Sequence, residues 1–351
     1  MRVLVAMSGG VDSSVAAALL VEQGHQVVGA TLKLWGGASD SGCCSVADVD
    51  DARRVAHQVG IDHHVFAMTE AFEEAVVGPY VRAHAEGRTP NPCIECNRHV
   101  KFDQLLGRAR RLGFDALATG HHARVARVGE RFDLRRGADP AKDQSYVLAM
   151  LGQGQLCDVL LPVGSMTKAE VRRHAARLGL ATADKPDSQD VCFISSGAGR
   201  AGFLAERVAL HRAEVVEAGS GDRVGSVEAV ELVTLGQRRG MGHGTDGRRR
   251  FVVAVDVPGR RVTVGSAEQA AVAGVALEAP SVTWVAEPLA AGAAVLAQLS
   301  AHGRPVAARF GGPATPGVAF AEPQRPVAPG QTVALYDPTD PDRVLGSGIA
   351  A

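Results

Sequence analysis

MRVLVAMSGGVDSS, residues 1–14, decides the fold of the first half of the chain. The apolar run 2–7 predicts a short strand, and Ser8-Gly9-Gly10 leads directly into a helical pattern. Glycines let a backbone approach an anion closely, and a helix start offers N–H donors and a positive dipole end. Asp12 could hold Mg²⁺ beside a phosphate. We therefore predict a phosphate-binding loop, distinct from a Walker A loop because no Gly-Lys-Ser/Thr follows; an ordinary glycine-containing turn is the alternative.

Strand and helix patterns alternate over the first two hundred residues. We expect strands at 2–7, 26–34, 63–67 and 115–119, and helices at 13–23, 46–59, 100–112 and 167–178. Thr167 and Glu170 form a capping box at the start of the last helix. Strands separated by helices imply a parallel sheet covered on both faces, so residues 1–209 are predicted to form one α/β domain.

The pattern changes after about residue 210, where helical periods end and short alternating strands begin. We expect strands at 227–235, 251–257, 262–265, 281–285, 295–300, 306–310 and 332–336. A softer break near residue 272 separates a small central β domain, 210–272, from a C-terminal β domain, 273–351. The strand pattern alone fits either a barrel or a sandwich.

The composition indicates a folded chain without strong overall charge. Hydrophobic residues make up 46% and charged residues 21% of the 351 residues, and the formal net charge is −1. A globally basic binder of polyanions is therefore excluded, although a local basic patch is not. No apolar run approaches the ~20 residues that span a bilayer, and the amino terminus lacks a signal-peptide pattern. We expect a cytoplasmic protein with no membrane partner.

Six cysteines in a reducing compartment point to thiol or metal chemistry rather than to a disulfide framework. Cys93 and Cys96 lie in a proline-stiffened loop, and we expect Cys96 at the N-terminus of the following helix, where the dipole favours a thiolate. Zinc is disfavoured because the adjacent Cys43 and Cys44 cannot easily supply a second ligand pair. Packing is the expected role of Cys43, Cys44 and Cys157.

The loop at Ser8–Ser14 resembles that of the N-type ATP pyrophosphatases, which attach AMP to a substrate oxygen and release pyrophosphate. Further blocks resemble one family among them, the tRNA-specific 2-thiouridylases (the MnmA/TrmU family), nearly from end to end. These blocks are ATGHHAR at 118–124, KDQSY at 142–146, LPVG at 161–164, KPDSQ at 185–189, VCFI at 191–194, LGQRRG at 235–240, PGQ at 329–331 and GSG at 346–348. With so many ordered blocks, the chain is identified as a member of this family.

The resemblance implies both a fold and a reaction. The fold would be a parallel-sheet ATP pyrophosphatase domain of the adenine nucleotide alpha hydrolase type, then the central β domain and a C-terminal β-barrel. The reaction would use ATP and Mg²⁺ to adenylate the C2 oxygen of the wobble uridine of certain tRNAs, and would then replace that oxygen by sulfur. Cys192 would carry the sulfur as a persulfide, and Cys96 would help release it and end in a disulfide with Cys192. A cysteine desulfurase or sulfur-relay protein would supply the sulfur, and an outside reductant would restore the thiols.

The same resemblance implies binding residues. Those for ATP are Ala6, Met7, Ser8, Gly9, Gly10, Val11, Asp12, Ser13, Leu32 and Gly120. Those for tRNA are Asn91, Pro92, Cys93, His121, Lys142, Asp143, Gln144 and Gln331. From the residues alone, Leu32 also fits a buried strand position, and His121 a strand-end histidine bonded to a carbonyl. The arginine-rich stretch from Arg238 to Arg250 fits either a tRNA phosphate patch or a solvated turn.

Cys93 departs from the family pattern, because many members have Asp at this position. The contact of that Asp with the target base therefore does not carry over directly. Cys93, Cys96 and Cys192 could instead ligate three irons of a [4Fe–4S] cluster, as an alternative to persulfide chemistry. Two other functions stay open: a small-molecule amidating ATP pyrophosphatase, which would need no thiols, and an RNA-binding module with a vestigial nucleotide site, which would release no AMP.

Overall fold

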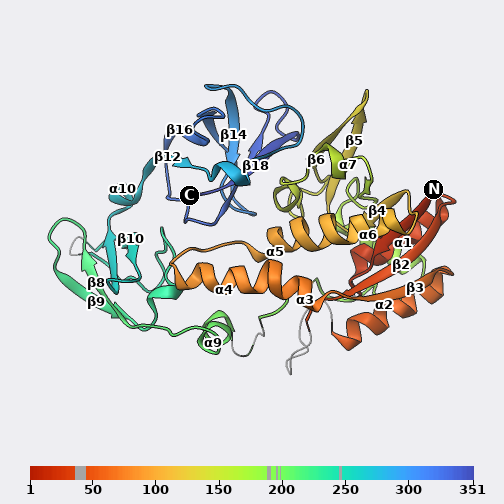
Figure 1. Ribbon diagram of the computed structural model, residues 1–351, viewed down its shortest axis with the longest axis horizontal. Coiled ribbons are helices and arrows are strands. Elements are labelled where there is room, and N and C mark those ends of the chain that lie inside the picture. Colours follow the sequence, from red (N-terminus) through yellow and green to blue (C-terminus); the bar gives the residue numbers. More distant parts are fainter. Residues whose placement is uncertain (36–44, 188–190, 195–196, 198, 245–246) are drawn as a thin grey trace.

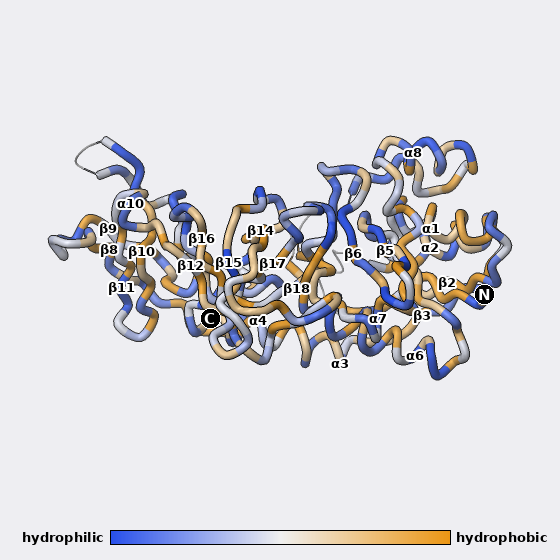
Figure 2. Tube along the Cα trace, turned by 90° about the horizontal axis from the view of Figure 1, so that it is seen from above, coloured by the Kyte–Doolittle hydropathy of each residue, from blue (hydrophilic) through white to orange (hydrophobic). Residues whose placement is uncertain are grey.

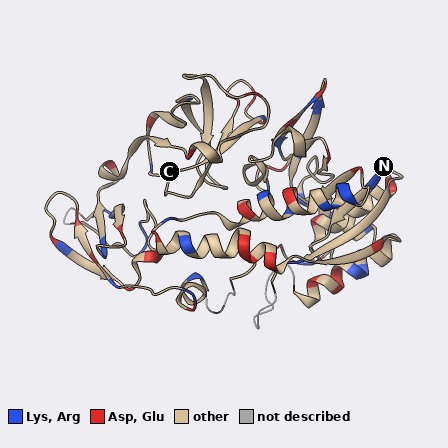
Figure 3. Ribbon diagram, viewed as in Figure 1, with Lys and Arg blue, Asp and Glu red and all other residues tan. Residues whose placement is uncertain are grey.

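The chain folds into three parts that follow one another in sequence. The computed structural model describes residues 1–35, 45–187, 191–194, 197, 199–244 and 247–351, so Cys43, Cys44 and residues 188 and 189 of the KPDSQ block lie outside the described residues. In Figure 1 the α/β part lies at one end, the central β part at the other, and the C-terminal β part packs above the helices between them. Figure 3 shows acidic and basic residues interspersed over all three parts, in keeping with the net charge of −1.

A five-stranded parallel sheet with the order β3-β2-β1-β4-β7 forms the centre of the first part, which confirms the predicted α/β fold. Its strands are β1 (Arg2–Ala6), β2 (Gln26–Lys33), β3 (Asp62–Ala67), β4 (Ala116–Thr119) and β7 (Val159–Leu160). Side chains of β1 alternate between two buried clusters because successive residues of a strand point to opposite faces. In Figure 2, β2 is mainly hydrophobic, whereas α8 mixes hydrophilic and hydrophobic residues.

Helices cover both faces of this sheet. Val3 and Val5 pack with α1 (Val11–Glu22), α2 (Val46–Val59) and α8 (Lys168–Arg177). Leu4 packs on the opposite side with two helical rods. The first rod contains α3 (Thr69–Phe72), η1 (Glu73–Val77) and α4 (Gly78–Ala85), and the second contains α5 (Pro92–Glu95), η2 (Cys96–Leu105) and α6 (Leu106–Arg111).

The second rod corrects one prediction, since the helix begins at Pro92 and not at residue 100. Both rods contain π-helical turns, η1 and η2, whose wider turn moves apolar residues away from the 3.6-residue period. The smaller elements of this part are β5 (Ala123–Val128), β6 (Arg131–Arg136), η3 (Ser145–Leu148), α7 (Gln153–Leu156) and α9 (Gly199–Ala205).

The central part is a four-stranded sheet of order β10-β11-β8-β9. Its strands are β8 (Ala213–Glu217), β9 (Arg223–Val227), β10 (Phe251–Asp256) and β11 (Arg261–Gly265). The predicted strand over 227–235 is wrong, because this segment forms the 3-10 turn η4 (Val230–Leu232). Glu231 in that turn is buried and accepts a hydrogen bond from the His211 backbone, which holds the chain out of the sheet.

The C-terminal part is a seven-stranded antiparallel sheet of order β12-β16-β15-β14-β17-β18-β13. Its elements are α10 (Ala267–Ala270), β12 (Val272–Ala276), η5 (Ala279–Ser281), β13 (Thr283–Trp284), β14 (Ala294–Gln298), β15 (Val306–Phe310), β16 (Gly317–Gln324), β17 (Thr332–Tyr336) and β18 (Val344–Ile349). A pairing of Leu277 with Ala350 joins the ends of β12 and β18, so the sheet curls into a barrel. The boundaries at 209/210 and 272/273 stay predictions.

The barrel is tied to the β5–β6 hairpin by charged side chains. Arg124 contacts Asp342 at 2.7 Å, and Arg135 contacts Asp340 at 2.8 Å. The Arg136 guanidinium lies 3.8 Å from the ring centre of the buried Tyr336. Within the described ranges, no helix is both long and apolar enough to cross a membrane.

Candidate active site

The predicted phosphate loop joins β1 to α1 at the carboxyl edge of the parallel sheet. Gly9 has a φ of +71°, and a β-carbon on it would lie 2.3 Å from the carbonyl oxygen of Asp48, so only glycine fits. The Ser13 hydroxyl donates to the Gly10 carbonyl at 3.1 Å and accepts from the Ser8 N–H at 3.2 Å. These contacts hold a tight turn at the start of a twelve-residue helix, which is the geometry that binds anions.

The apolar members of the predicted ATP set face the core. Met7 and Val11 are buried among the residues that join the sheet to α1, and Ala6 is the half-buried last residue of β1. Leu32 lies on β2 and is buried in the cluster on the opposite side of the sheet, which agrees with the alternative of a buried strand position. Backbone atoms of Ala6, Met7 and Val11, rather than their side chains, are thus suited to line a nucleotide site.

Asp12 is held by two groups that sequence reasoning missed. Lys168 on α8 places its Nζ 2.7 Å from each carboxylate oxygen, and His122 Nε2 lies 3.0 Å from Oδ1. Burial raises the pKa of Asp12, but the hydrogen bonds from His122 and Lys168 outweigh it and leave the pKa lowered. The carboxylate is thus paired with protein donors in this structure, and its predicted role as a Mg²⁺ ligand stays a prediction. In the described part of the chain, no group of three or more His, Cys, Asp or Glu side chains is arranged to hold a metal ion.

Asp187 gathers three cations next to Asp12. Its carboxylate lies 2.8 Å from Lys168, 2.7 Å from Lys142 and 2.9 Å from Arg172. Burial opposes ionisation, but the hydrogen bonds from Lys142 and Lys168 lower the pKa of Asp187 to about 2. The signals that could have located this cluster were the KPDSQ block and the capping box, since Lys168 follows the N-cap directly.

The turn at residues 119–122 joins the phosphate loop to the second helical rod. A β-carbon on Gly120 would lie 2.5 Å from the Ser13 backbone nitrogen, so this glycine makes room for the loop itself. On the other side, the His121 ring centre lies 5.9 Å from that of Phe102. Burial, with Lys101 and His122 nearby, lowers the pKa of His121 well below its usual range, so this ring is neutral near pH 7.

The second rod places Cys93 and Cys96 differently from the prediction. The Asn91 side chain caps the helix by accepting from the Cys93 N–H at 3.1 Å, and the buried Pro92 occupies the first helical position. Cys93 therefore lies in the first turn and is exposed, whereas Cys96 lies one turn further and is buried, 7% exposed. Asn97, the next residue, fixes this turn by donating to the Val147 carbonyl at 3.0 Å.

Cys192 is half-buried and packs against the same apolar cluster that contains Cys96. Its neighbour Phe193 is buried in an aromatic group, with ring centres 5.1 Å from Phe203 and 5.5 Å from Tyr80. Tyr80 belongs to α4, which lies beside the rod that carries Cys96 (Figure 1). Both predicted sulfur-handling residues thus contact one large apolar cluster, which extends from the first part into the C-terminal part.

The predicted tRNA-binding segment 142–144 has mixed surroundings. Lys142 is 41% exposed and pairs with Asp187. The side chain of Asp143 is only 7% exposed, and its carboxylate forms an ion pair with Arg136 at 2.6 Å inside the protein. The Gln144 side-chain oxygen accepts from the His122 N–H at 2.8 Å, which ties this segment to the 119–122 turn.

Gln331 brings the barrel to the cysteine-bearing rod. Its side-chain amide donates to the Thr89 carbonyl, and the Thr89 N–H donates to the Pro329 carbonyl at 2.8 Å. Residues 89–91 lead directly to Pro92, so the barrel contacts the chain just before the predicted target-base residues.

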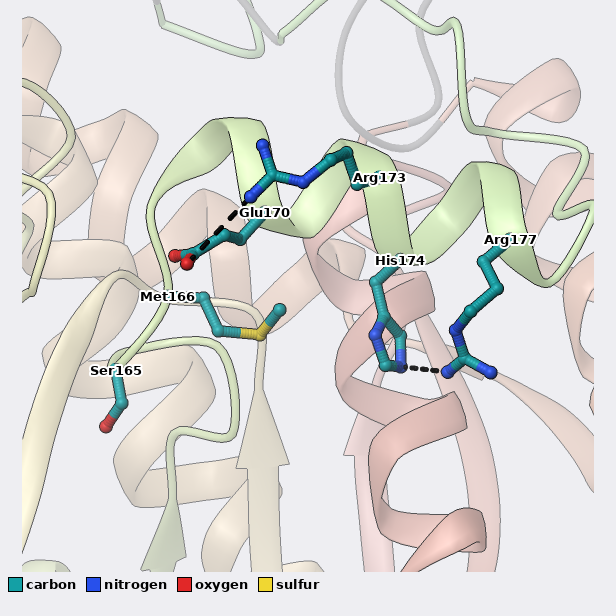
Figure 4. Close-up of a pocket in the computed structure, with 6 residues that line it drawn as sticks. All are labelled: Ser165, Met166, Glu170, Arg173, His174 and Arg177. Atoms are coloured by element: carbon teal, nitrogen blue, oxygen red, sulfur yellow. Dashed lines mark hydrogen bonds and ion pairs between the residues drawn. The ribbon is translucent and has the colours of Figure 1, made fainter.

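A shallow pocket beside α8 has none of the predicted site residues in its lining. Figure 4 shows Arg173 turned toward Glu170, and His174 toward Arg177. Its lining residues are Ser165, Met166, Glu170, Arg173, His174 and Arg177. None of them touches the phosphate loop or either rod in the contacts described above.

The parallel sheet, the glycine-rich loop at its carboxyl edge and the adjacent cationic cluster define an ATP pyrophosphatase type of nucleotide-binding domain. Residues 1–196 match the model described as the tRNA methyl transferase HUP domain, residues 201–266 the PRC-barrel domain of the same series, and residues 276–350 an aminomethyltransferase beta-barrel domain. The chain belongs to the MnmA family of tRNA-specific 2-thiouridylases.

Curated relatives with that name match over almost their whole length. The protein of Acidothermus cellulolyticus is 45% identical over 361 residues, covering 100% of this chain and 98% of the relative. That of Mycobacterium avium is 46% identical over 367 residues, covering 100% and 99%. A solved 4-thiouridine synthetase–RNA complex with bound ATP has 17% identity and a TM-score of 0.37, and covers 55% of this chain and 44% of its own; nothing about function follows from so distant a likeness.

Proposed function

We propose that this chain is a tRNA 2-thiouridine synthase, a tRNA-uridine 2-sulfurtransferase acting on the wobble uridine. The observation that carries the proposal is the 119–122 turn, which contacts the phosphate loop through Gly120 and His122 and the cysteine-bearing rod through His121. Activation by ATP and attack by sulfur must occur on the same base, so the two sets of residues have to meet at a common boundary. The names of the curated relatives support the same reaction.

The reaction proceeds in three steps, each of which forms one bond and breaks another. The C2 oxygen of the uridine attacks the α-phosphorus of ATP, and pyrophosphate leaves into the loop at Ser8–Ser13. The terminal sulfur of a persulfide on Cys192 then attacks C2, the C2–O bond breaks and AMP departs. Finally the Cys96 thiolate attacks Sγ of Cys192, which leaves the sulfur on C2 and forms a Cys96–Cys192 disulfide. Two electrons from an outside reductant restore both thiols.

Two features of the surroundings suit this chemistry. The apolar cluster around Cys96 keeps water from hydrolysing a reactive sulfur species. Lys142 belongs to the cationic cluster around Asp187, and Gln331 contacts Thr89, just before the cysteine-bearing rod. The two residues come from different parts of the chain and are therefore suited to hold an anticodon loop from two sides. Mg²⁺ would enter with ATP, and we propose that Asp12 of the phosphate loop, which contacts Lys168 and His122 in this structure, holds it there.

Persulfide chemistry fits these residues better than an iron–sulfur cluster. Cys93 is exposed on the first turn and Cys96 buried one turn further, and neither forms part of a metal-ligand group with Cys192 in the described residues. We propose a cysteine desulfurase or a sulfur-relay protein as the donor, acting in the reducing cytoplasm where the thiols can be restored.

The test is a thiolation assay on unmodified tRNA under anaerobic conditions, with Mg·ATP, a cysteine desulfurase and cysteine. We expect 2-thiouridine in nucleoside digests and one AMP for each base modified. Cys96→Ser and Cys192→Ser should each lose product formation by several orders of magnitude, whereas Cys157→Ser, at an exposed cysteine outside the site, should keep it. Full activity of both serine variants would refute the sulfur chemistry and favour an amidating ATP pyrophosphatase, and product that follows iron content would favour a cluster.

A further inference from the structure

The proposed reaction uses the thiols of Cys96 and Cys192 but gives no chemical role to the thiol of Cys93. Cys93 is exposed, whereas Cys96, three residues further along, is only 7% exposed. Cys96 belongs to the large apolar cluster, and Cys192 packs against that cluster. The disulfide that the reaction leaves between Cys96 and Cys192 therefore forms at the cluster, with the Cys96 side withdrawn from solvent.

We propose that Cys93 is the resolving thiol of this protein and passes electrons from an external dithiol to the Cys96–Cys192 disulfide. This inference rests on the proposed function, because it concerns the disulfide that the proposed reaction leaves behind. It assigns to an exposed thiol the step that returns the protein to its starting state.

Successive thiol–disulfide exchanges accomplish this transfer. The Cys93 thiolate attacks Sγ of Cys96, the Cys96–Cys192 bond breaks, and Cys192 leaves as a thiolate that takes up a proton. A thiolate of the external dithiol then attacks Sγ of Cys93, and Cys96 leaves as a thiolate. The second thiol of the dithiol displaces Cys93 from the mixed disulfide. The dithiol is thereby oxidised by two electrons, and all three cysteines are thiols again.

The first argument is the geometry of the turn that carries both cysteines. The Cys96 N–H donates to the Cys93 carbonyl as well as to that of Pro92, and the Ile94 N–H donates to the Asn91 carbonyl at 3.2 Å. Bonds between residues three apart are those of a 3-10 helix, in which the side chains of such residues lie directly above one another. Their β-carbons on an α-helix are about 5–6 Å apart, and a disulfide requires about 3.5–4.5 Å. A slight tightening of this one turn therefore joins Cys93 to Cys96.

The second argument is access. Thiol–disulfide exchange requires the attacking thiolate to reach the sulfur itself. A reducing protein cannot enter a cluster of close-packed apolar side chains, so it does not reach Cys96 directly. Cys93 needs no entry path because it belongs to the same helical turn, and its exposed position is open to the reductant.

The third argument is that neighbouring contacts hold both ends of this turn. The Asn91 side chain accepts from the Cys93 N–H at 3.1 Å, and Pro92 beside it is buried. Asn97, which follows Cys96, donates to the Val147 carbonyl at 3.0 Å. The two thiols therefore stay close together throughout the cycle, which favours an exchange within the chain over one between molecules.

The first test follows the disulfide after one round of reaction. Persulfide-loaded protein is mixed with unmodified tRNA and Mg·ATP without reductant, the remaining thiols are alkylated, and tryptic peptides are analysed by mass spectrometry. Cys93 and Cys96 share the peptide 89–98, so a disulfide between them stays inside one peptide, whereas a Cys96–Cys192 disulfide joins two peptides. We expect mainly the internal disulfide in the parent protein and the joined peptides in Cys93→Ser.

The second test measures the rate of reduction. Proteins oxidised with one equivalent of diamide are treated with a thioredoxin-type dithiol protein, and the loss of each mapped disulfide is timed. We expect Cys93→Ser to be reduced at least about tenfold more slowly than the parent, because only the half-buried Cys192 then remains for attack. Cys157→Ser is the matched control, since Cys157 is also exposed but follows α7, and it should be reduced at the parent rate.

Two results would overturn the inference: a parent protein whose site disulfide is only that between Cys96 and Cys192, or equal rates of reduction for the parent and Cys93→Ser. The proposed function is judged separately, by whether the parent makes 2-thiouridine. A parent that makes none contradicts the function, and the disulfides of the diamide-oxidised proteins then decide the role of Cys93. A parent that thiolates tRNA but gives either of the two results contradicts the role of Cys93 alone.

Discussion

Replacing Gly120 by alanine should weaken ATP binding through a backbone collision. The added β-carbon would lie 2.5 Å from the Ser13 nitrogen, 2.7 Å from the Asp12 carbonyl carbon and 2.9 Å from the Ser13 α-carbon. These are backbone atoms that cannot rotate away, and ordinary contact begins at 3.4 Å, so the loop or the end of β4 must move by about 0.9 Å. Overpacking of this kind costs about 1–3 kcal/mol. If the loop takes up the displacement, the affinity for ATP falls by about 5- to 150-fold.

Calorimetric titration with ATP measures this effect, and urea unfolding shows whether the variant is folded. The matched control is Gly154→Ala, because a β-carbon there meets nothing within 4 Å and the residue lies in the short helix α7. We expect the control to bind ATP normally and to be as stable as the parent protein or up to about 1 kcal/mol more stable. A folded Gly120→Ala protein with unchanged ATP affinity would refute the expectation that the collision displaces a loop that binds ATP.

Two further substitutions test the interior. Arg136→Met should cost about 3–5 kcal/mol of unfolding free energy, because it leaves the buried Asp143 carboxylate without its cation. Arg131→Met removes an exposed ion pair and should cost at most about 1 kcal/mol. Equal losses of the two variants in urea unfolding would contradict this prediction. Burial lowers the pKa of His84 from 6.5 to about 4. The unfolded chain then binds a proton that the folded protein does not, so the parent should lose up to about 3 kcal/mol as the pH falls from 6.5 to 4. His84→Phe should remove this part of the loss, and parallel pH profiles of the two proteins would show that His84 is not its source.

Local patterns predicted the elements on which the site is built. The helix over 46–59 has the predicted bounds, and the turn from β1 into α1 lies where the Ser-Gly-Gly sequence indicated. The contact of Lys168 with Asp12 could not be predicted, because an ion pair depends on the packing of α8 beside α1 and leaves no periodic signal. The burial of Cys96 was missed for a different reason: the helix begins at Pro92, so Cys96 lies one turn into it and packs in the apolar cluster.

The turn at residues 329–331 has a consequence for the exchange of parts between relatives. Gly330 has a φ of +90°, and a β-carbon on it would lie 3.2 Å from the nitrogen of Pro90. The turn of the barrel therefore packs closely against the main chain just before Pro92. A chimaera that receives a foreign barrel should need the matching 88–92 segment as well. In protein engineering, this barrel and the start of the cysteine-bearing helix form a single exchangeable unit.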